Sequence, residues 1–397
     1  MDALLEKSAT LVARTHSTFK RYLYYQINWK NRLTGIKGSR GTGKTTLLLQ
    51  RLSELNESPT KAAYFSLDDL YFTTHSLADT VGDFYKQGGQ YLFLDEVHKY
   101  KNWATHVKNV YDFYPDLQIV FTGSSIIDIA REEGDLSRRV RMYELHGLSY
   151  REYLSYTGAL QINALPLNAL LSGSSAWKSA FPGDFRPLEH FEDYLIRGYY
   201  PFFSEDPEGM PDRLQQLARA IVEFDMAELH DFDIRNAKKM LQLLYIVSSN
   251  VPFKPNISKL AEKSQIHRNT INSYLHFLEE ARLVHLLYPG GTGIAILQKP
   301  EKIYLDNTNL VYALSGNRPD RGNLRETFFL NQVAAVHDIR YPKQGDFLVD
   351  GKWTFEIGGK NKGTGQIRDI TDSFVVIDDV PYPVSAGIPL WLFGFLY

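Results

Sequence analysis

The octapeptide GSRGTGKT, residues 38–45, is the feature that most constrains the fold of this chain. It fits the pattern G-x-x-x-x-G-K-[ST], whose glycines let successive backbone N–H groups surround a phosphate at the start of a helix. The apolar run Leu33–Ile36 precedes the motif, and the helical run TTLLLQRL begins at its last residue. Because the motif requires this strand–loop–helix context, we predict a phosphate-binding loop within an α/β sheet.

Lys44 and Thr45 of this loop have separate expected roles. Lys44 would reach the β- and γ-phosphates of ATP, and the Thr45 hydroxyl would bind Mg²⁺. ATP and Mg²⁺ are therefore the expected ligands. The predicted nucleotide contacts are the loop residues and the threonine that follows them: Gly38, Ser39, Arg40, Gly41, Thr42, Gly43, Lys44, Thr45 and Thr46.

Four short apolar runs in the first 150 residues predict the sheet itself. Each run ends in small or acidic residues, and helix-like sequence separates it from the next. This alternation is typical of a parallel sheet with helices on both faces. The runs are LTGIKG, AAYFSLDD, YLFLDE and LQIVFTGSS.

The third run places two acids at the end of a buried strand. Asp95 can hold the water shell of Mg²⁺ there, and Glu96 can orient and deprotonate the water that attacks ATP. A strand-end Asp-Glu pair alone is common and usually only solvated. The prediction of ATP hydrolysis therefore depends on its combination with the loop. His98 and Lys99 are read as surface residues.

The fourth run ends in Thr122, Ser124 and Ser125. One of these polar groups is expected to hydrogen-bond the γ-phosphate or the attacking water, and the sequence does not say which. A plain turn is the alternative.

Three arginines, Arg138, Arg139 and Arg141, then precede a new helix. An arginine supplied to a neighbouring subunit's γ-phosphate would explain this cluster, and a solvated basic turn would explain it equally well.

The run HRNTINSYLHFLEEARLV predicts a helix with one apolar and one polar face. Ile271, Leu275 and Leu278 recur at helical spacing with Tyr274 beside them. The polar edge of the first turns carries four candidate nucleic-acid contacts: Arg268, Asn269, Asn272 and Ser273. With the short helix SKLAEKS before it, the segment predicts a helix-turn-helix whose second helix could enter a DNA major groove. A module that docks a protein partner or covers the nucleotide is the alternative.

The order of these motifs resembles that of the AAA-type ATPases of bacteria and archaea that carry a C-terminal domain related to the PD-(D/E)xK nucleases. The resemblance rests on the loop, the Asp-Glu strand, TGSS, LSRR and GLSYREYL, and on FEDYLIRGYYP and KIYLDNTNLVYAL, so it covers nearly the whole chain. It implies an oligomer, expected to be a ring. The family often has Gly then Arg after Leu-Ser, which aligns Arg139 with the expected finger.

The C-terminal segment GDFLVDGKWTFEIGGKNKG tests the nuclease part of this resemblance. Asp350-Gly351 predicts a hairpin turn, and only an odd-length loop gathers the apolar residues of both strands on one face. That register puts Asp346 and Glu356 together, and Glu326 could approach them. A nuclease of this type has a lysine where Gly358 stands; Lys360, roughly 13 Å along an extended strand, would have to fold back. We therefore predict a degenerate site and a scaffold for DNA binding or subunit contact.

Composition limits the remaining possibilities. The net charge of −2 argues against a chain coated in basic surface, so contact with DNA must come from local patches. The absence of cysteine excludes thiolate zinc sites and disulfides and fits a cytoplasmic protein. The N-terminus does not resemble a signal peptide, and no apolar run approaches the ~18 residues of a membrane helix, so no membrane contact is expected.

At 397 residues the chain is expected to hold several domains. We predict a P-loop core with an N-terminal helix over residues 1–150, a helical lid over 151–235, a winged helix-turn-helix over 236–300 and a small α/β nuclease-like domain over 301–397. Within the lid, LSGSSAWKSAFPGDF is expected to be a surface loop. The expected function is an oligomeric ATPase that couples hydrolysis to work on DNA. The alternative is an ATP-controlled switch that docks a protein partner.

Overall fold

The computed structural model describes residues 1–397 apart from 16–17, 127–133, 174–176, 227–233, 250–256, 291–298, 316–318, 364 and 384–386. The chain forms two compact units, Met1–Gly147 and Leu148–Tyr397. None of the helices in the described ranges has the length and apolar content needed to cross a membrane.

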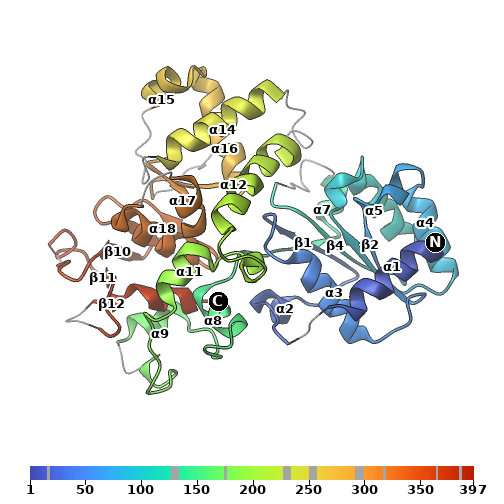
Figure 1. The fold of residues 1–397 in the computed structure, drawn as a ribbon, viewed down its shortest axis with the longest axis horizontal. Helices are drawn as coiled ribbons and strands as arrows, with labels where there is room; N and C mark the ends of the chain where they lie inside the picture. Colours follow the sequence, from blue (N-terminus) through green and yellow to red (C-terminus); the bar gives the residue numbers. More distant parts are fainter. Residues whose placement is uncertain are drawn as a thin grey trace. The chain divides into compact units, whose positions relative to one another are not determined.

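The first unit is built on a five-stranded sheet in the order β2-β3-β4-β1-β5, in which all neighbouring strands are parallel (Figure 1). The strands are β1 (Leu33–Gly38), β2 (Ala62–Ser66), β3 (Tyr91–Asp95), β4 (Gln118–Ser124) and β5 (Arg141–Glu144). The prediction of a parallel sheet from four apolar runs is confirmed. The fifth strand was missed because RMYE is short and carries charges at both ends.

Helices cover both faces of this sheet. α2 and α3 contribute to one hydrophobic cluster and α4 and α5 to the other. The helices of the unit are α1 (Asp2–Ala13), α2 (Tyr22–Gln26), α3 (Lys44–Leu55), α4 (Leu77–Lys86), α5 (Trp103–Phe113) and α7 (Gly134–Ser137), with 3₁₀ turns at Leu70–Thr73 and Val97–Lys99.

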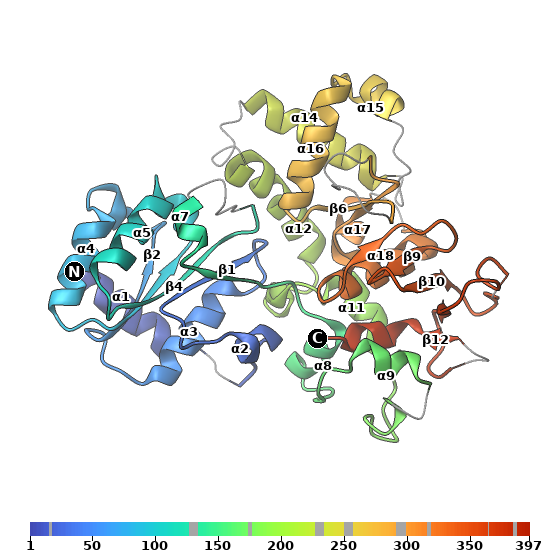
Figure 2. The same cartoon turned by 180° about the vertical axis from the view of Figure 1, so that it is seen from behind.

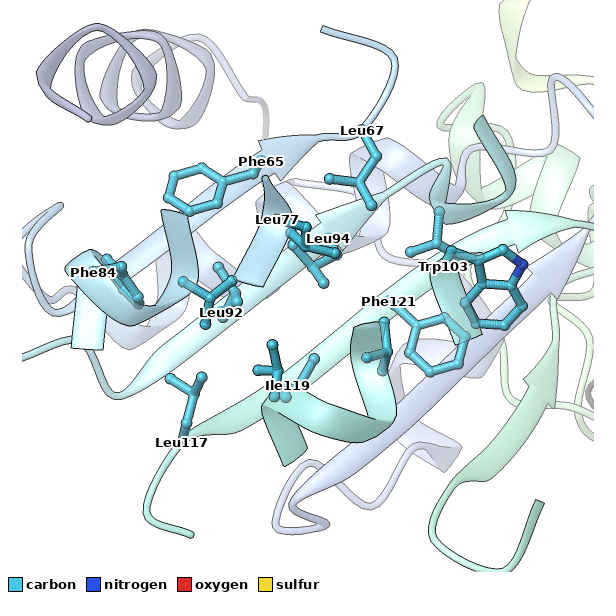
Figure 3. Packing of buried hydrophobic residues seen from close by; sticks show 14 of the residues in the cluster. Phe65, Leu67, Leu77, Phe84, Leu92, Leu94, Trp103, Leu117, Ile119 and Phe121 are labelled. Atoms are coloured by element: carbon cyan, nitrogen blue, oxygen red, sulfur yellow. The ribbon is translucent and has the colours of Figure 1, made fainter. Parts of the chain in front are cut away.

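Alternation along the strands explains why both faces are covered. In β3, Leu92 and Leu94 belong to one cluster and Phe93 to the other. Figure 3 shows the first of these clusters, where strand residues pack with Phe84 of α4 and Trp103 of α5. Full burial of each such side chain contributes about 1.5–3 kcal/mol. The two layers thus hold the carboxyl ends of β1, β3 and β4 together at one edge of the sheet.

The second unit begins with helices and ends with a mixed sheet. Its helices are α8 (Tyr150–Tyr156), α9 (Leu167–Leu171), α11 (Phe191–Arg197), α12 (Met210–Ala220), α14 (Ile234–Ser248), α15 (Ile257–Ser264), α16 (Arg268–Glu280), α17 (Thr308–Leu314) and α18 (Arg321–Ala334). A π-helical turn, Ile221–Asp225, continues α12, and 3₁₀ helices lie at Pro201–Ser204 and Leu390–Phe395.

α14, α15 and α16 pack on one another, and α16 leads into the antiparallel pair β6 (Val284–Leu287) and β7 (Lys302–Leu305) (Figures 1 and 2). Three helices followed by a two-stranded ribbon is the arrangement that a winged helix-turn-helix would need. Much of the segment that joins the two strands, residues 291–298, falls outside the described residues, so the tip of the predicted wing is not described.

The second sheet has the order β12-β11-β10-β9-β8. Its strands are β8 (Ile339–Arg340), β9 (Phe347–Val349), β10 (Trp353–Gly358), β11 (Ser373–Ile377) and β12 (Ile388–Pro389). Trp353 pairs with Val349 and Phe355 with Phe347, which leaves the three-residue loop 350–352. The predicted odd-length loop is confirmed. Phe347 and Phe355 lie on one face and pack on Phe329 of α18, with ring centroids 5.2 and 5.1 Å away.

The segment expected to be a surface loop is anchored in the core of the second unit. Trp177 is only 2% exposed and packs edge-on against Trp391, with ring centroids 6.2 Å apart. Phe181 also packs on Trp391, at 5.2 Å. Because these aromatic contacts come from the far end of the chain, the local Gly, Ser and Pro content could not reveal them. Residues 174–176 of the segment lie outside the described ranges.

Candidate functional site

The predicted phosphate-binding loop lies between β1 and α3, as its motif requires. Gly41 and Gly43 have φ values of 84° and 93°, a region that residues with a side chain rarely enter. A Cβ at Gly38 would come within 2.5 Å of the Leu145 carbonyl oxygen. All three glycines of the motif are therefore required by backbone geometry, and the loop can bring its N–H groups close to a phosphate.

Lys44 is the first residue of α3, and its side chain is only 5% exposed. Its Nζ donates to the carbonyl oxygens of Gly38 at 3.0 Å and Ser39 at 3.2 Å. The Thr42 hydroxyl donates to the same Ser39 carbonyl at 2.9 Å. These contacts hold the ammonium of Lys44 against the backbone of the loop.

The remaining predicted contacts vary in accessibility. Arg40 and Thr46 are exposed at the surface of the first unit, whereas Thr45 is half-buried beside Lys44. All nine predicted nucleotide contacts lie on the β1–α3 connection or the first turn of α3.

Arg21 supports this loop, a role that was not predicted. Its buried guanidinium donates to the carbonyl oxygen of Thr42 at 2.6 Å and to those of His146 and Gly147 at 2.7 and 2.8 Å. It therefore ties the loop to the segment after β5. Arg21 lies in the unremarkable run KRYLYYQ, and only the tertiary structure brings it here.

Asp95 ends β3 and accepts hydrogen bonds from three hydroxyl groups. Thr45 donates at 2.6 Å and Tyr64 of β2 at 2.7 Å, both to Oδ2, and Thr122 of β4 donates to Oδ1. Thr45 and Asp95 thus bring a hydroxyl and a carboxylate oxygen together, which are ligands that Mg²⁺ prefers. The residues fit the ion that the sequence predicts. Tyr64 was missed because its ring counts as an ordinary member of an apolar strand.

Glu96 follows Asp95 with a left-handed backbone, φ 53°. Such a conformation is uncommon for a residue with a side chain and costs about 1–3 kcal/mol. Its N–H donates to the Thr122 hydroxyl at 3.1 Å, and its Oε1 lies 3.8 Å from the Nζ of Lys44. The carboxylate, 32% exposed, therefore faces the loop from the neighbouring strand end.

His98 is not a surface residue, contrary to the prediction. Its side chain is 1% exposed, and its Nε2 lies 3.4 Å from Oε2 of Glu96. On the other side, the backbone N–H of Ser124 donates to its Nδ1 at 3.3 Å. Burial, with smaller effects from the charges of Lys99, Lys44 and Arg40, lowers the pKa of His98 to about 3. The imidazole is therefore neutral at ordinary pH.

Polar groups at the end of β4 contact Asp95, Glu96 and His98. Thr122 is fully buried between Asp95 and Glu96, and Ser124 contacts His98 through its backbone N–H. The hydroxyl of Ser124 accepts from the N–H of Ile126 at 3.4 Å, and Ser125 is buried beside it.

The three arginines separate in space. Arg139 forms a two-pronged ion pair with Asp112 of α5, with distances of 3.0 and 3.2 Å. Arg141 begins β5 and stacks over Tyr143, 5.5 Å from its ring centroid. Arg138 is exposed in the turn before β5. Arg139 therefore has an acidic partner within its own unit, and its side chain is about a quarter exposed.

In the second unit, α16 has the two faces that its spacing predicts. Ile271, Tyr274, Leu275 and Leu278 are all buried. The residues predicted to contact DNA, namely Arg268, Asn269, Asn272 and Ser273, are all exposed on the first two turns.

The acids of the nuclease-like segment do come together, but each meets a lysine. Lys302 of β7 lies 3.0 Å from Glu326 of α18 and 3.5 Å from Asp346. Tyr304 also donates to Glu326, at 2.5 Å. Within the described part of the chain, no three His, Cys, Asp or Glu side chains are grouped as ligands for a metal ion.

Glu356, 1% exposed in β10, pairs with Lys362 and not with Lys360. The stem of Lys362 fills the space over Gly358, where an added Cβ would come within 2.4 Å of it. Lys360 points elsewhere and pairs with exposed Asp379 at 2.9 Å. Only Lys360, the first lysine of GGKNKG, was considered from the sequence. The turn after β10 instead brings Lys362, the second lysine, to Glu356. Burial raises the pKa of Glu356, and Lys362 opposes that shift.

Three solved structures are similar to this chain at low identity. AMPPCP-bound DnaA from Aquifex aeolicus is 17% identical, with a TM-score of 0.29, and the match covers 64% of this chain and 82% of that one. The Hsp104–ADP complex of S. cerevisiae is 16% identical, with a TM-score of 0.29 and coverage of 71% and 39%. PCH-2 of C. elegans is 14% identical, with a TM-score of 0.24 and coverage of 70% and 67%. At these TM-scores the likeness supports no conclusion about ligands or assembly.

Sequence families match two parts of the chain. The AAA domain family matches residues 30–154, and a family described as a domain of unknown function matches residues 188–321. The uncharacterized protein MJ1637 of Methanocaldococcus jannaschii is 28% identical over 321 residues, which cover 75% of this chain and 67% of that protein. The first match includes the phosphate-binding loop, Asp95 and Glu96, and it supports an AAA-type P-loop ATPase.

Proposed function

We propose that this protein is an oligomeric ATPase that couples ATP hydrolysis to binding or remodelling DNA. The observation that carries the proposal is the convergence of Lys44 and Thr45 on one side with Asp95 and Glu96 on the other. A phosphate-binding loop facing a strand-end acid pair is the arrangement that ATP hydrolysis needs.

The chemistry follows from the position of each group. Water attacks the γ-phosphorus, the bond to the β-phosphate oxygen breaks, and the products are ADP and inorganic phosphate. Glu96 orients this water and accepts its proton, because its carboxylate is partly exposed and faces the loop. Lys44 and the loop N–H groups balance the charge on the phosphates.

Thr45 and Asp95 would hold Mg²⁺, with Asp95 itself fixed by Tyr64 and Thr122. When bound, the ion supplies charge neutralisation to the β- and γ-phosphate oxygens. The hydroxyl donors keep the Asp95 carboxylate in one orientation without cancelling its charge.

The DNA part of the proposal depends on α16. Its exposed first turns present one guanidinium and two carboxamides, the side chains that pair with guanine and adenine edges. The competing function is an ATP-controlled switch that docks a protein partner. It is favoured by the modest positive charge of this face, which carries Arg268 as its one cation among the four predicted contacts.

ATP turnover measured with and without several forms of DNA tests the proposal. We expect Lys44→Ala to lose tight nucleotide binding, because its ammonium contacts phosphate before reaction. We expect DNA to increase wild-type turnover and the protein to form a closed oligomer. Slow turnover that no DNA changes, from a monomer, would instead support the switch.

A further inference from the structure

We infer that His98 is a positioning residue that holds the carboxylate of Glu96 and connects it to the end of β4. The inference rests on the proposed role of Glu96 in ATP hydrolysis and goes beyond it. His98 would not touch the substrate. It would act by fixing the group that does.

The contacts of the ring set its tautomer. Because the backbone N–H of Ser124 can only donate, Nδ1 of His98 must be the acceptor in their 3.3 Å contact. A neutral imidazole then carries its proton on Nε2, the nitrogen that lies 3.4 Å from Oε2 of Glu96. The ring therefore accepts from β4 through Nδ1 and places its protonated nitrogen 3.4 Å from the carboxylate.

Burial keeps the ring in this neutral form, and the charges of Lys99, Lys44 and Arg40 add to the effect. With the side chain almost fully buried, a charged imidazole would lose its hydration. A neutral donor orients Glu96 but does not neutralise it, so the carboxylate keeps its ability to accept a proton.

Glu96 is consequently held at two points by two connections to β4. The hydroxyl of Thr122 accepts from its backbone N–H, and His98 bridges its side chain to the backbone of Ser124. Glu96 has a left-handed backbone at the end of β3, and its Oε2 lies 3.4 Å from Nε2 of His98, close enough for the ring to orient the carboxylate. A displacement of the β4 end would then be transmitted to the Glu96 carboxylate.

An ordinary core histidine would pack on apolar residues and satisfy its nitrogens with nearby carbonyl groups. The adjacent residue, Val97, occupies the hydrophobic cluster, whereas both ring nitrogens of His98 face polar groups of the site. The geometry therefore indicates a role tied to Glu96 and not to the core alone.

Three substitutions at His98 separate these roles. His98→Phe keeps a buried ring and removes both nitrogens, so we expect kcat to fall about 10- to 100-fold with KM for ATP within threefold, as expected when a hydrogen bond to a charged group is lost. His98→Gln can still place an N–H near Glu96 and should retain kcat within about fivefold. His98→Asn is too short to reach Glu96 and should behave like His98→Phe.

The control is the same substitution in the Glu96→Gln background, measured in single-turnover reactions. If His98 acts through Glu96, His98→Phe adds no further loss there. The inference is overturned if His98→Phe hydrolyses ATP within twofold of wild type, or if its loss adds fully to that of Glu96→Gln. If His98→Phe does not fold, equal rates for His98→Gln and His98→Asn overturn it. A wild-type protein that binds ATP without hydrolysing it overturns the proposed function as well, which distinguishes the two failures.

Discussion

Two acidic sites in this molecule, one in each unit, are held in different ways. In the first unit, Asp95 accepts hydrogen bonds from three hydroxyl groups, and Glu96 lies 3.4 Å from the neutral His98 ring and 3.8 Å from the ammonium of Lys44. In the second unit, the carboxylates are in direct contact with lysines. Glu356 pairs with Lys362, and Glu326 and Asp346 share Lys302.

The difference shows what each site can do with its charge. Hydroxyl and imidazole donors hold a carboxylate in place and leave its charge available for a metal ion or a proton. A lysine in contact cancels that charge, and buried carboxylates need such a partner to remain ionised. The first site is thus arranged to act on a ligand, whereas the second is balanced internally.

The backbone conformations of Glu96 and Glu356 also differ between the two sites. Glu96 has a left-handed backbone, a cost that structures tend to bear at functional positions. Glu356 is paired with Val375 of β11 in a regular parallel register and is not among the residues with positive φ. The second site is therefore explained by packing and charge balance within the sheet.

The largest expected effect concerns Arg139, which belongs to neither of the two acidic sites. If Arg139 completes a neighbouring subunit's site, Arg139→Ala should lower kcat about 1,000-fold and leave nucleotide affinity within a few-fold. Mixing it with Lys44→Ala subunits should restore turnover in trans. Asp112→Ala is the matched control, because it removes the same ion pair and keeps the arginine. Equal losses in the two variants, with no rescue on mixing, would show that Arg139 only supports α5.

The second prediction disturbs the charge balance of the second unit. Lys362→Met keeps the stem over Gly358 but leaves Glu356 buried without its cation, and should cost about 3 kcal/mol of unfolding free energy at pH 7. Lys360→Met is the control in the same loop. Its partner Asp379 is exposed, so the loss should stay below about 1 kcal/mol.

The direction of the pH effect sharpens this test. Burial raises the pKa of Glu356 in the folded state, and losing Lys362 would raise it further. As pH rises above the unfolded value, the unfolded chain releases the proton that the folded chain keeps, so stability falls. The cost of Lys362→Met should therefore be smaller at pH 4 than at pH 7 in urea unfolding. A cost that is equal at both pH values, or equal to that of Lys360→Met, contradicts the pairing.

The smallest effect lies outside both acidic sites. If the second unit serves by binding DNA, its contacts should lie on α16, and Arg268→Ala or Asn269→Ala should weaken binding several-fold. The wild-type affinity should fall with salt, with a log–log slope of about −0.9 per neutralised phosphate. Fluorescence anisotropy with labelled DNA measures both. Binding that ignores salt, or no binding at low salt, would assign α16 to a protein partner.

Some of these features were predictable from sequence and some were not. The phosphate-binding loop and the strands that carry Asp95 and Thr122 were predicted. Each shows a recognisable pattern of residue types within a short stretch of sequence. The hairpin register that brings Asp346 to Glu356 was predicted because only one loop length buries the apolar residues.

The residues that local patterns missed depend on distant partners. Arg21 reaches the loop from the start of α2, and Lys302 reaches Glu326 from β7. His98 was misread because a histidine after a strand end is usually solvated, whereas here the end of β4 covers it. Such contacts are decided by tertiary packing, which a single sequence does not display.

The central claim is that this chain hydrolyses ATP at its first acidic site and does no chemistry at its second. ATP turnover and plasmid nicking should be measured together, with Mg²⁺ or Mn²⁺, for wild type, Glu96→Gln, Glu356→Ala and Lys362→Ala. We expect Glu96→Gln to bind ATP but lose turnover by at least about 100-fold, Glu356→Ala to stay near wild type, and no protein to nick DNA. Metal-dependent nicking that persists in Glu96→Gln and disappears in both Glu356→Ala and Lys362→Ala would contradict the claim.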